Sequence, residues 1–191
     1  MFFINLDSYQ LRYIYHTDKH KSAYIIELSL DEYDDLFNSW DGSALDRKEL
    51  NPELADYLQR ASWELPIKNK VELCFYMPEE EKDIKKEKDS KATIKNNFRM
   101  DLHLINRDLK TNNKKSLIYI IMGIIFLFPT LILKNSDFNL WLDMLMQGFF
   151  VGGWVFLWEA FSLFFFASHD LRDKKKRYLR YLDSDIKFKY Y

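Results

Sequence analysis

The chain has 191 residues, with 28 lysines and arginines against 29 aspartates and glutamates, so its formal net charge is −1. This balance gives no general reason to expect a nucleic acid as a partner. The single cysteine, Cys74, excludes a disulfide within these residues and fits a reducing compartment for the polar part of the chain.

Residues 1–78 are predicted to form a small cytoplasmic domain of the α/β (α+β) class. Tyr24–Leu28 is rich in β-branched and aromatic residues, which predicts a strand. Ser29–Glu32 has the spacing of a capping box. Apolar residues from Tyr33 to Trp40 then recur at helical spacing, so a helix is expected there.

A second helix is expected to begin at Asn51, because asparagine is a favoured N-cap and Pro52 suits the first helical position. Val71–Met77 is the strongest strand prediction, and Pro78 ends it. Ile186–Tyr190 alternates apolar and basic residues, as a half-exposed strand does. If this last strand pairs with the earlier ones, the residues between them form one long insertion in a single unit.

Residues 79–115 are predicted to be a charged linker and an amphipathic helix that leads into the membrane. Glu79–Asp89 carries many charges of both signs, which is typical of a solvated linker. From Ser90 to Leu109 the apolar residues step by three or four, which predicts the helix. Asn112 and Asn113 are a possible break before the membrane.

Residues 116–133 and 144–167 are predicted to be two transmembrane helices. The first segment has 18 residues and no charge, and the second has 24 residues and one charge, Glu159. About 20 apolar residues cross a hydrocarbon core, so each segment is long enough. Residues 134–143 then form a short external loop, with Phe138 and Trp141 as expected interface anchors.

Basic residues gather before the first span and after the second, whereas the loop between the spans holds one lysine. The positive-inside rule therefore predicts a multi-pass protein of the cell (inner) membrane with both termini in the cytoplasm. Residues 168–191 are predicted to form a basic cytoplasmic helix and the C-terminal strand. Membrane orientation alone explains the basic clusters. One of them is also a candidate site for anionic lipid headgroups, and its residues are Lys174, Lys175, Lys176 and Arg177.

Glu159 is the main candidate for function within the membrane. It lies about 12 Å from the cytoplasmic end of its span, where a carboxyl group costs roughly 2.5–3.5 kcal/mol on insertion scales. Protonation, a partner or water would offset this cost. Gly148 and Gly152 share its side of the helix in a small-xxx-small pattern, and Tyr119 is the nearest hydroxyl group on the first span.

Two interpretations stay open for the side of the second span that carries Gly148, Gly152 and Glu159. It can be a packing seam with a neutral, hydrogen-bonded Glu159, or it can handle protons, ions or a ligand between the helices. The opposite side of the second span carries an aromatic ridge that includes Trp154 and Trp158, which suits lipid or a neighbouring subunit.

Catalytic and metal signals are weak. No Gly-rich phosphate loop, GxSxG, HExxH or CxxC pattern is present, so no catalytic residue, enzyme activity or cofactor is expected. His16 and His20 are four residues apart and would suit a metal ion only on a helix, which nothing around them predicts. Cys74 is expected to be a small core residue of a strand.

The stretch Gly153–Ala160, the triplet Phe164–Phe166 and the segment Lys175–Leu182 together resemble a group of uncharacterised bacterial two-span proteins. Leu50–Tyr57 is also similar to that group. The resemblance covers about two-thirds of the chain, with no activity assigned to the group, and it implies two spans and a bacterial inner membrane.

These observations favour a membrane-anchored, homo-oligomeric scaffold or sensor that presents its cytoplasmic domain to a protein partner. A small oligomeric channel or proton-coupled permease centred on Glu159 is the first alternative. A membrane-disrupting effector regulated by its cytoplasmic domain is the second. The lipid bilayer is the partner common to all three.

Overall fold

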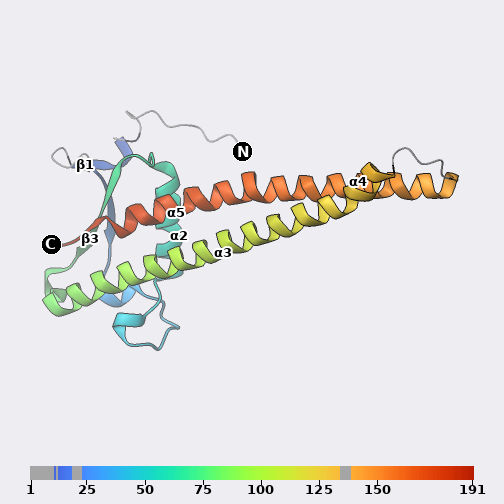
Figure 1. Ribbon diagram of the computed structural model, residues 1–191. Helices are drawn as coiled ribbons and strands as arrows, with labels where there is room; N and C mark the ends of the chain where they lie inside the picture. Colours follow the sequence, from blue (N-terminus) through green and yellow to red (C-terminus); the bar gives the residue numbers. More distant parts are fainter. Residues whose placement is uncertain (1–10, 12, 19–22, 134–138) are drawn as a thin grey trace. The chain divides into compact units, whose positions relative to one another are not determined.

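The computed structural model of the protein describes residues 11, 13–18, 23–133 and 139–191. Four strands form one mixed sheet in the order β1-β2-β3-β4 (Figure 1). Their bounds are β1 His16–Asp18, β2 Ala23–Ser29, β3 Lys70–Met77 and β4 Asp185–Tyr190. β1 is antiparallel to β2, while the β2–β3 and β3–β4 pairs are parallel. The expected return of the C-terminal strand to the sheet is therefore confirmed, and the α+β class fits.

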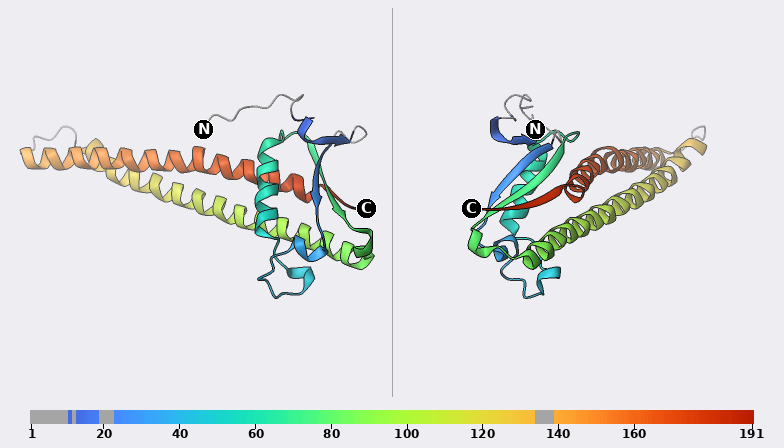
Figure 2. Two further views of the ribbon diagram at one scale, coloured as in Figure 1. Left: turned by 180° about the vertical axis from the view of Figure 1, so that it is seen from behind. Right: turned by 90° about the vertical axis from the view of Figure 1, so that its left-hand side faces the viewer.

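Helices cover one face of this sheet. Alternate residues of the strands point into the core, among them Ile26, Leu73, Phe75 and Ile186. Figure 2 shows α2 (Pro52–Glu64) running alongside the strands. Because the side chains alternate between the two sides of a strand, the other face of the sheet carries the polar residues of β2, β3 and β4.

The start of α2 confirms the prediction made from Asn51 and Pro52. The Asn51 side chain accepts a hydrogen bond of 2.9 Å from the Glu53 N–H, and Pro52 is the first helical residue. Leu58 and Ala61 are buried in the core. The helix ends at Glu64, two residues before Pro66.

The helix expected between Ser29 and Trp40 is replaced by a single 3-10 turn, η1 Tyr33–Leu36. The capping box is present but shifted, since Asp35 accepts hydrogen bonds from the N–H groups of Asp31 and Glu32. The chain then extends at Phe37, which forms a bridge with Leu50, so no second turn can follow. A second short turn, η2, spans Leu45–Arg47.

The expected linker at Glu79–Asp89 is largely helical. A 3-10 turn, η3, covers Glu79–Glu81, and α3 then runs from Ile84 to Ile132 without a break at the asparagine pair. The Asp83 carboxylate accepts hydrogen bonds from the Lys85 and Lys86 N–H groups and so caps the first turn. Charges of both signs four residues apart can form ion pairs that stabilise a helix, and Glu87 and Lys91 form such a pair at 2.5 Å.

The second long helical stretch has three parts. These are α4 Leu140–Ser162, the π-helical turn η4 Leu163–Ala167 and α5 Ser168–Leu182. Of the expected external loop, residues 134–138, with Phe138, lie outside the described residues. The rest differs from the prediction, because Asn139 caps α4 and Trp141 already belongs to that helix.

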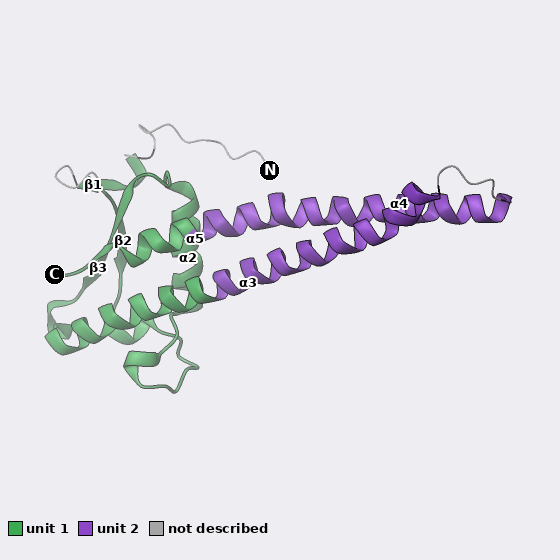
Figure 3. Ribbon diagram, in the orientation of Figure 1, with its two compact units in different colours: residues 1–103, 176–191 green, residues 104–175 purple. Residues whose placement is uncertain are grey.

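The chain divides into two compact units (Figure 3). Unit 1 consists of residues 1–103 and 176–191, and unit 2 of residues 104–175. In sequence, unit 2 is thus an insertion in unit 1. Two helices, Ile84–Ile132 and Leu140–Leu182, are long and apolar enough to cross a membrane. Only 11% of the most apolar window of each is buried, whereas the core helix of a soluble protein would be mostly buried.

Candidate functional site

Within unit 1, α5 holds the C-terminal end of α2 through two arginines. Arg177 Nη1 donates to the carbonyl oxygens of Ser62 and Leu65, and its guanidinium lies 4.2 Å from the centre of the Trp63 ring. Arg180 donates to the carbonyl oxygens of Ser62 at 3.0 Å and Pro66 at 2.8 Å. The last carbonyls of a helix lack partners within it and favour cations, so both arginines stabilise this end.

A lysine of α3 holds the end of α5 in the same way. Lys95 Nζ donates to the carbonyl oxygens of Tyr181, Leu182 and Ser184. Burial lowers the pKa of the Lys95 ammonium. The Phe98 ring stacks on Tyr181 with ring centres 5.2 Å apart.

Tyr181 completes this arrangement. It is 1% exposed, and its hydroxyl donates a 2.6 Å hydrogen bond to the Leu58 carbonyl of α2. Burial raises the pKa of its hydroxyl. We refer to Lys95, Phe98, Arg177, Arg180 and Tyr181 as the helix clamp. The clamp ties α2, α3 and α5 together, and β4 begins three residues after α5 ends.

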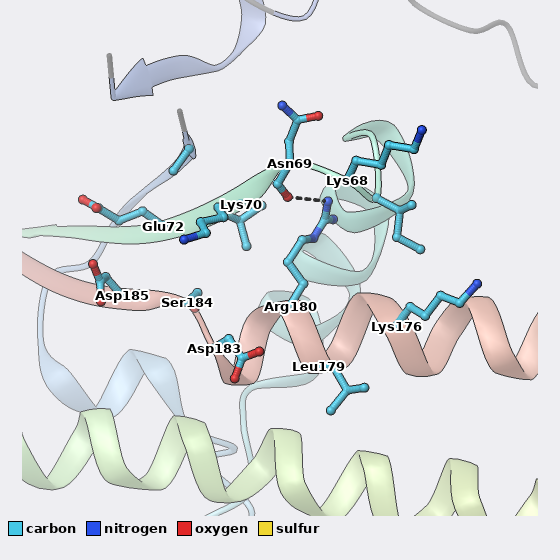
Figure 4. Close-up of a pocket in the computed structure, with 13 residues that line it drawn as sticks. Lys68, Asn69, Lys70, Glu72, Lys176, Leu179, Arg180, Asp183, Ser184 and Asp185 are labelled. Atoms are coloured by element: carbon cyan, nitrogen blue, oxygen red, sulfur yellow. Dashed lines mark hydrogen bonds between the residues drawn. The ribbon is translucent and has the colours of Figure 1, made fainter. Parts of the chain in front are cut away.

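Beside the clamp lies an open cleft of about 860 Å³. Figure 4 shows charged side chains around it, with Arg180 reaching toward the Asn69 carbonyl at 3.4 Å. The cleft lies between the start of β3 and the end of α5, so Arg180 belongs to both the clamp and the cleft. Its charged lining consists of Lys68, Lys70, Glu72, Lys176, Arg180, Asp183 and Asp185. Such a mixed lining suits a small polar ligand that carries both charges.

The expected headgroup cluster is distributed differently in the structure. Arg177 is engaged with α2 and Trp63, so it is not an exposed cation. Lys176 lines the cleft, and Lys174 and Lys175 are half-buried. The sequence pattern could not show this, because the partners of Arg177 lie more than a hundred residues earlier in the chain.

In unit 2, α3 and α4 pack at a different seam from the expected one. A Cβ atom on Gly123 would lie 2.8 Å from Leu157, and one on Gly153 would lie 2.6 Å from Leu127. Each would also lie 3.1 Å from the other glycine's carbonyl oxygen, so these two glycines bring the backbones together. The expected seam is therefore corrected at Gly148, which has nothing within 4 Å of a Cβ position.

Gly152 belongs partly to this seam. A Cβ atom there would lie 3.1 Å from the Phe126 ring. Phe126 also packs on Phe149, with ring centres 5.2 Å apart. Gly148 and Gly152 lie about 40° apart around α4, so the small-xxx-small pattern lies at the edge of the seam, with Gly152 against Phe126 and Gly148 exposed.

Glu159 lies on the exposed side of α4. Its carboxylate has no hydrogen bond or ion pair with any residue in the described part of the chain. Tyr119, its expected partner, instead stacks on Phe156 with ring centres 6.1 Å apart. Trp154 and Trp158 are 56% and 67% exposed, as an outward aromatic ridge would be.

The level of Glu159 along the helix pair also differs from the expectation. Ser116 donates a 2.9 Å hydrogen bond to the carbonyl of Ala160, so these two residues lie side by side. Glu159 is therefore level with the first turn of the first predicted span, close to Lys115. The depth inferred from the second span alone overestimates the distance from Glu159 to the basic residues that precede the first predicted span.

The polar face of the sheet carries a cluster that the sequence analysis missed. The Glu27 carboxylate accepts hydrogen bonds of 2.7 Å from the Tyr76 hydroxyl and from His16 Nδ1. These bonds, that of Tyr76 foremost, lower the pKa of Glu27. Lys189 Nζ donates to the Tyr76 hydroxyl at 3.2 Å. Alternation along β2, β3 and β4 was the available signal.

No metal or nucleophile site emerges among the described residues. No group of three or more metal-ligating side chains occurs among them. His16 lies on a strand, and His20 is outside the described residues. Cys74 is fully buried in β3.

No family model, curated protein or solved structure matches this chain. The resemblance carried by the second span therefore stays a prediction. Any function has to be inferred from the geometry of the helix clamp, the cleft and the exposed face of α4.

Proposed function

We propose that this chain is a two-pass integral membrane protein of a bacterial inner membrane, with both termini and unit 1 in the cytoplasm. The exposure of the two apolar helices supports this, because side chains so apolar and so little buried need a covering other than water. The basic residues at one end of each predicted span support the orientation.

Within that membrane the protein acts as a homo-oligomeric sensor or scaffold that presents unit 1 to a cytoplasmic protein partner. The helix clamp is the observation that carries this proposal. α3 and α5 continue the two predicted spans. Lys95 of α3 holds the end of α5, and Tyr181 of α5 bonds to α2, so the three helices are linked. A change in either helix would reach the cleft through Arg180, which lines it.

Oligomerisation is assigned to the exposed face of α4. At about 100° per residue, Gly148, Val155, Glu159 and Ser162 fall on one side of the helix. Val155 is 60% exposed, and Gly148 leaves room for another backbone. This face can meet the same face of a second copy about a two-fold axis, which would give each Glu159 a carboxyl partner.

A small channel or proton-coupled permease is the second candidate, and the outward position of Glu159 favours it. A carboxyl group turned away from its own α3 can line a path between several copies. Replacing Glu159 with Gln separates the two functions. A scaffold tolerates the neutral isostere, whereas a proton pathway loses flux in liposomes.

Hydrogen–deuterium exchange of the full chain in lipid nanodiscs tests the sensor proposal. The substitution Gly153→Val perturbs the helix pair, and we expect altered exchange in residues 58–69, where the clamp holds α2. Adding Lys95→Met should remove that response, while Lys85→Met, on an exposed turn of the same helix, should not. Unchanged exchange at 58–69 in Gly153→Val would contradict the proposal.

A further inference from the structure

Unit 2 also carries an apolar groove, separate from the exposed face that holds Glu159. A groove of about 330 Å³ opens between α3 and α4 at the end nearest Ser116. At about 100° per residue, Leu157 and Phe161, which line it, lie on the side of α4 opposite Glu159. The lining is almost entirely apolar and consists of Ser116, Ile120, Leu157, Ala160, Phe161, Phe164 and Phe165.

The only polar side chain of this lining is already satisfied. The Ser116 hydroxyl donates to the Ala160 carbonyl, so it offers no hydrogen to a ligand. The groove therefore suits a hydrocarbon chain better than a polar molecule.

Cations lie next to two residues that line the groove, Phe164 and Ser116. Arg172 Nη2 donates a 3.1 Å hydrogen bond to the Phe164 carbonyl, and its guanidinium lies 5.5 Å from the centre of the Phe164 ring. The same side chain is exposed. Lys114 and Lys115 are also exposed and come directly before Ser116 in α3.

The π-helical turn explains why Arg172 is held there. In η4 the backbone ladder shifts by one residue, and the Ser168 hydroxyl donates to the Leu163 carbonyl at 2.9 Å. The neighbouring Phe164 carbonyl accepts from Arg172. The turn thus fixes a cation over one wall of an apolar groove, while part of its guanidinium stays accessible.

We propose that this groove binds one acyl chain of an anionic phospholipid, with the lipid phosphate placed between Arg172 and Lys115. The inference rests on the proposed membrane insertion, and it assigns the lipid specificity to a site that differs from the Lys174–Arg177 cluster. Charge complementarity favours this occupant, because a second apolar helix would leave the cations beside the groove without a counter-charge.

Native mass spectrometry of the full chain tests this proposal. The protein is released from nanodiscs made of equal parts dioleoyl phosphatidylglycerol and dioleoyl phosphatidylcholine, and the retained lipids are counted. We expect one phosphatidylglycerol per chain. Arg172→Gln should reduce the preference for phosphatidylglycerol about fivefold. Arg107→Gln, which removes an equal charge from an exposed position on α3, should leave the preference unchanged.

A substitution that fills the groove provides a second, independent test of the proposal. Ile120 is 40% exposed at its rim, so Ile120→Trp should abolish retention of the lipid, whereas Ile120→Val should not. Free glycerol phosphate should not displace the lipid, and displacement would overturn the acyl-chain part of the proposal. Retention without headgroup preference in the wild-type protein would overturn the anionic part.

The failure of this inference is distinguishable from the failure of the proposed function. A chain that does not enter nanodiscs contradicts membrane insertion. A chain that enters them and retains no phospholipid contradicts the groove alone.

Discussion

The Ser116 hydroxyl donates a hydrogen bond to the carbonyl of Ala160, and both residues are buried between α3 and α4. This bond sets the antiparallel register of unit 2, and the Gly123–Gly153 approach two turns further along is consistent with it. The register turns Glu159 away from α3 and places it level with the start of the first predicted span, next to the basic residues that precede that span. As a result, one side of α4 packs on α3, and another side, which carries Glu159, is exposed.

Two glycines of α4 should respond differently to the same substitution. Gly153→Val would force Leu127 and the Gly123 backbone away, and overpacking of this kind costs about 1–3 kcal/mol. Gly148→Val meets nothing within the chain and should leave the fold of one copy unchanged. Unfolding in mixed micelles measures both variants. Equal destabilisation of the two would contradict the seam.

The exposed face of α4 should cross-link to itself. In a Cys74→Ala background, Val155→Cys is expected to form a disulfide-linked dimer in membranes upon mild oxidation. Phe161→Cys, on the opposite side of α4, is the matched control and should remain monomeric. Dimers at both positions would indicate random collision, and dimers at neither would contradict self-association through this face.

Arg177 should matter for the stability of unit 1 and not for lipid binding. Arg177→Gln removes the charged donor of the Leu65 carbonyl, leaves the Ser62 carbonyl with Arg180 alone and removes the stacking on Trp63. A charged hydrogen bond of this kind contributes roughly 1.5–3 kcal/mol. Chemical unfolding of the full chain in nanodiscs should show a loss of about that size. Lys175→Gln, two residues earlier, should show little change.

The Glu27 cluster predicts a pH dependence on the acid side. Hydrogen bonds from Tyr76 and His16 lower the pKa of Glu27 below its usual value of 4.5, so the folded state favours the ionised form. Its contribution to stability is present above about pH 4.5 and is lost as the pH falls through the lowered pKa. The difference in unfolding free energy between the wild type and Glu27→Gln should therefore shrink below that pH.

A control variant isolates this effect. Glu49 is exposed, and Glu49→Gln should leave the pH profile of unfolding unchanged. If Glu27→Gln and the wild type lose stability in parallel from pH 5 to pH 3, the hydrogen bonds to Glu27 do not stabilise the fold.

Much of the fold could be predicted from local patterns. Asn51 and Pro52 define a helix start by themselves, and Val71–Met77 is a strand in any context that buries one side. The helix predicted from the apolar residues between Tyr33 and Trp40 was wrong, because one 3-10 turn followed by a bridge buries Tyr33, Leu36 and Phe37 and leaves Trp40 exposed. Short apolar runs cannot separate these outcomes.

The candidate site depended on contacts that are distant in sequence. Small residues at Gly148 and Gly152 indicated a close helix approach, but the register places Gly153 and Gly123 at the closest contact with α3 instead. Lys95 lies next to an apolar stripe and had the pattern of a solvated lysine. The carbonyl groups to which it donates come 86 to 89 residues later, and no local sequence pattern predicts these contacts.

The most direct test of the whole account is a membrane-topology measurement by thiol labelling in intact and permeabilised bacterial cells. In a Cys74→Ala background, single cysteines replace Asn139, at the start of α4, and Asn69, in the loop before β3. The account predicts that an impermeant maleimide labels the cysteine at 139 in intact cells and the one at 69 only after permeabilisation. Labelling of both positions, or of neither, in intact cells would contradict a two-pass protein with a cytoplasmic unit 1.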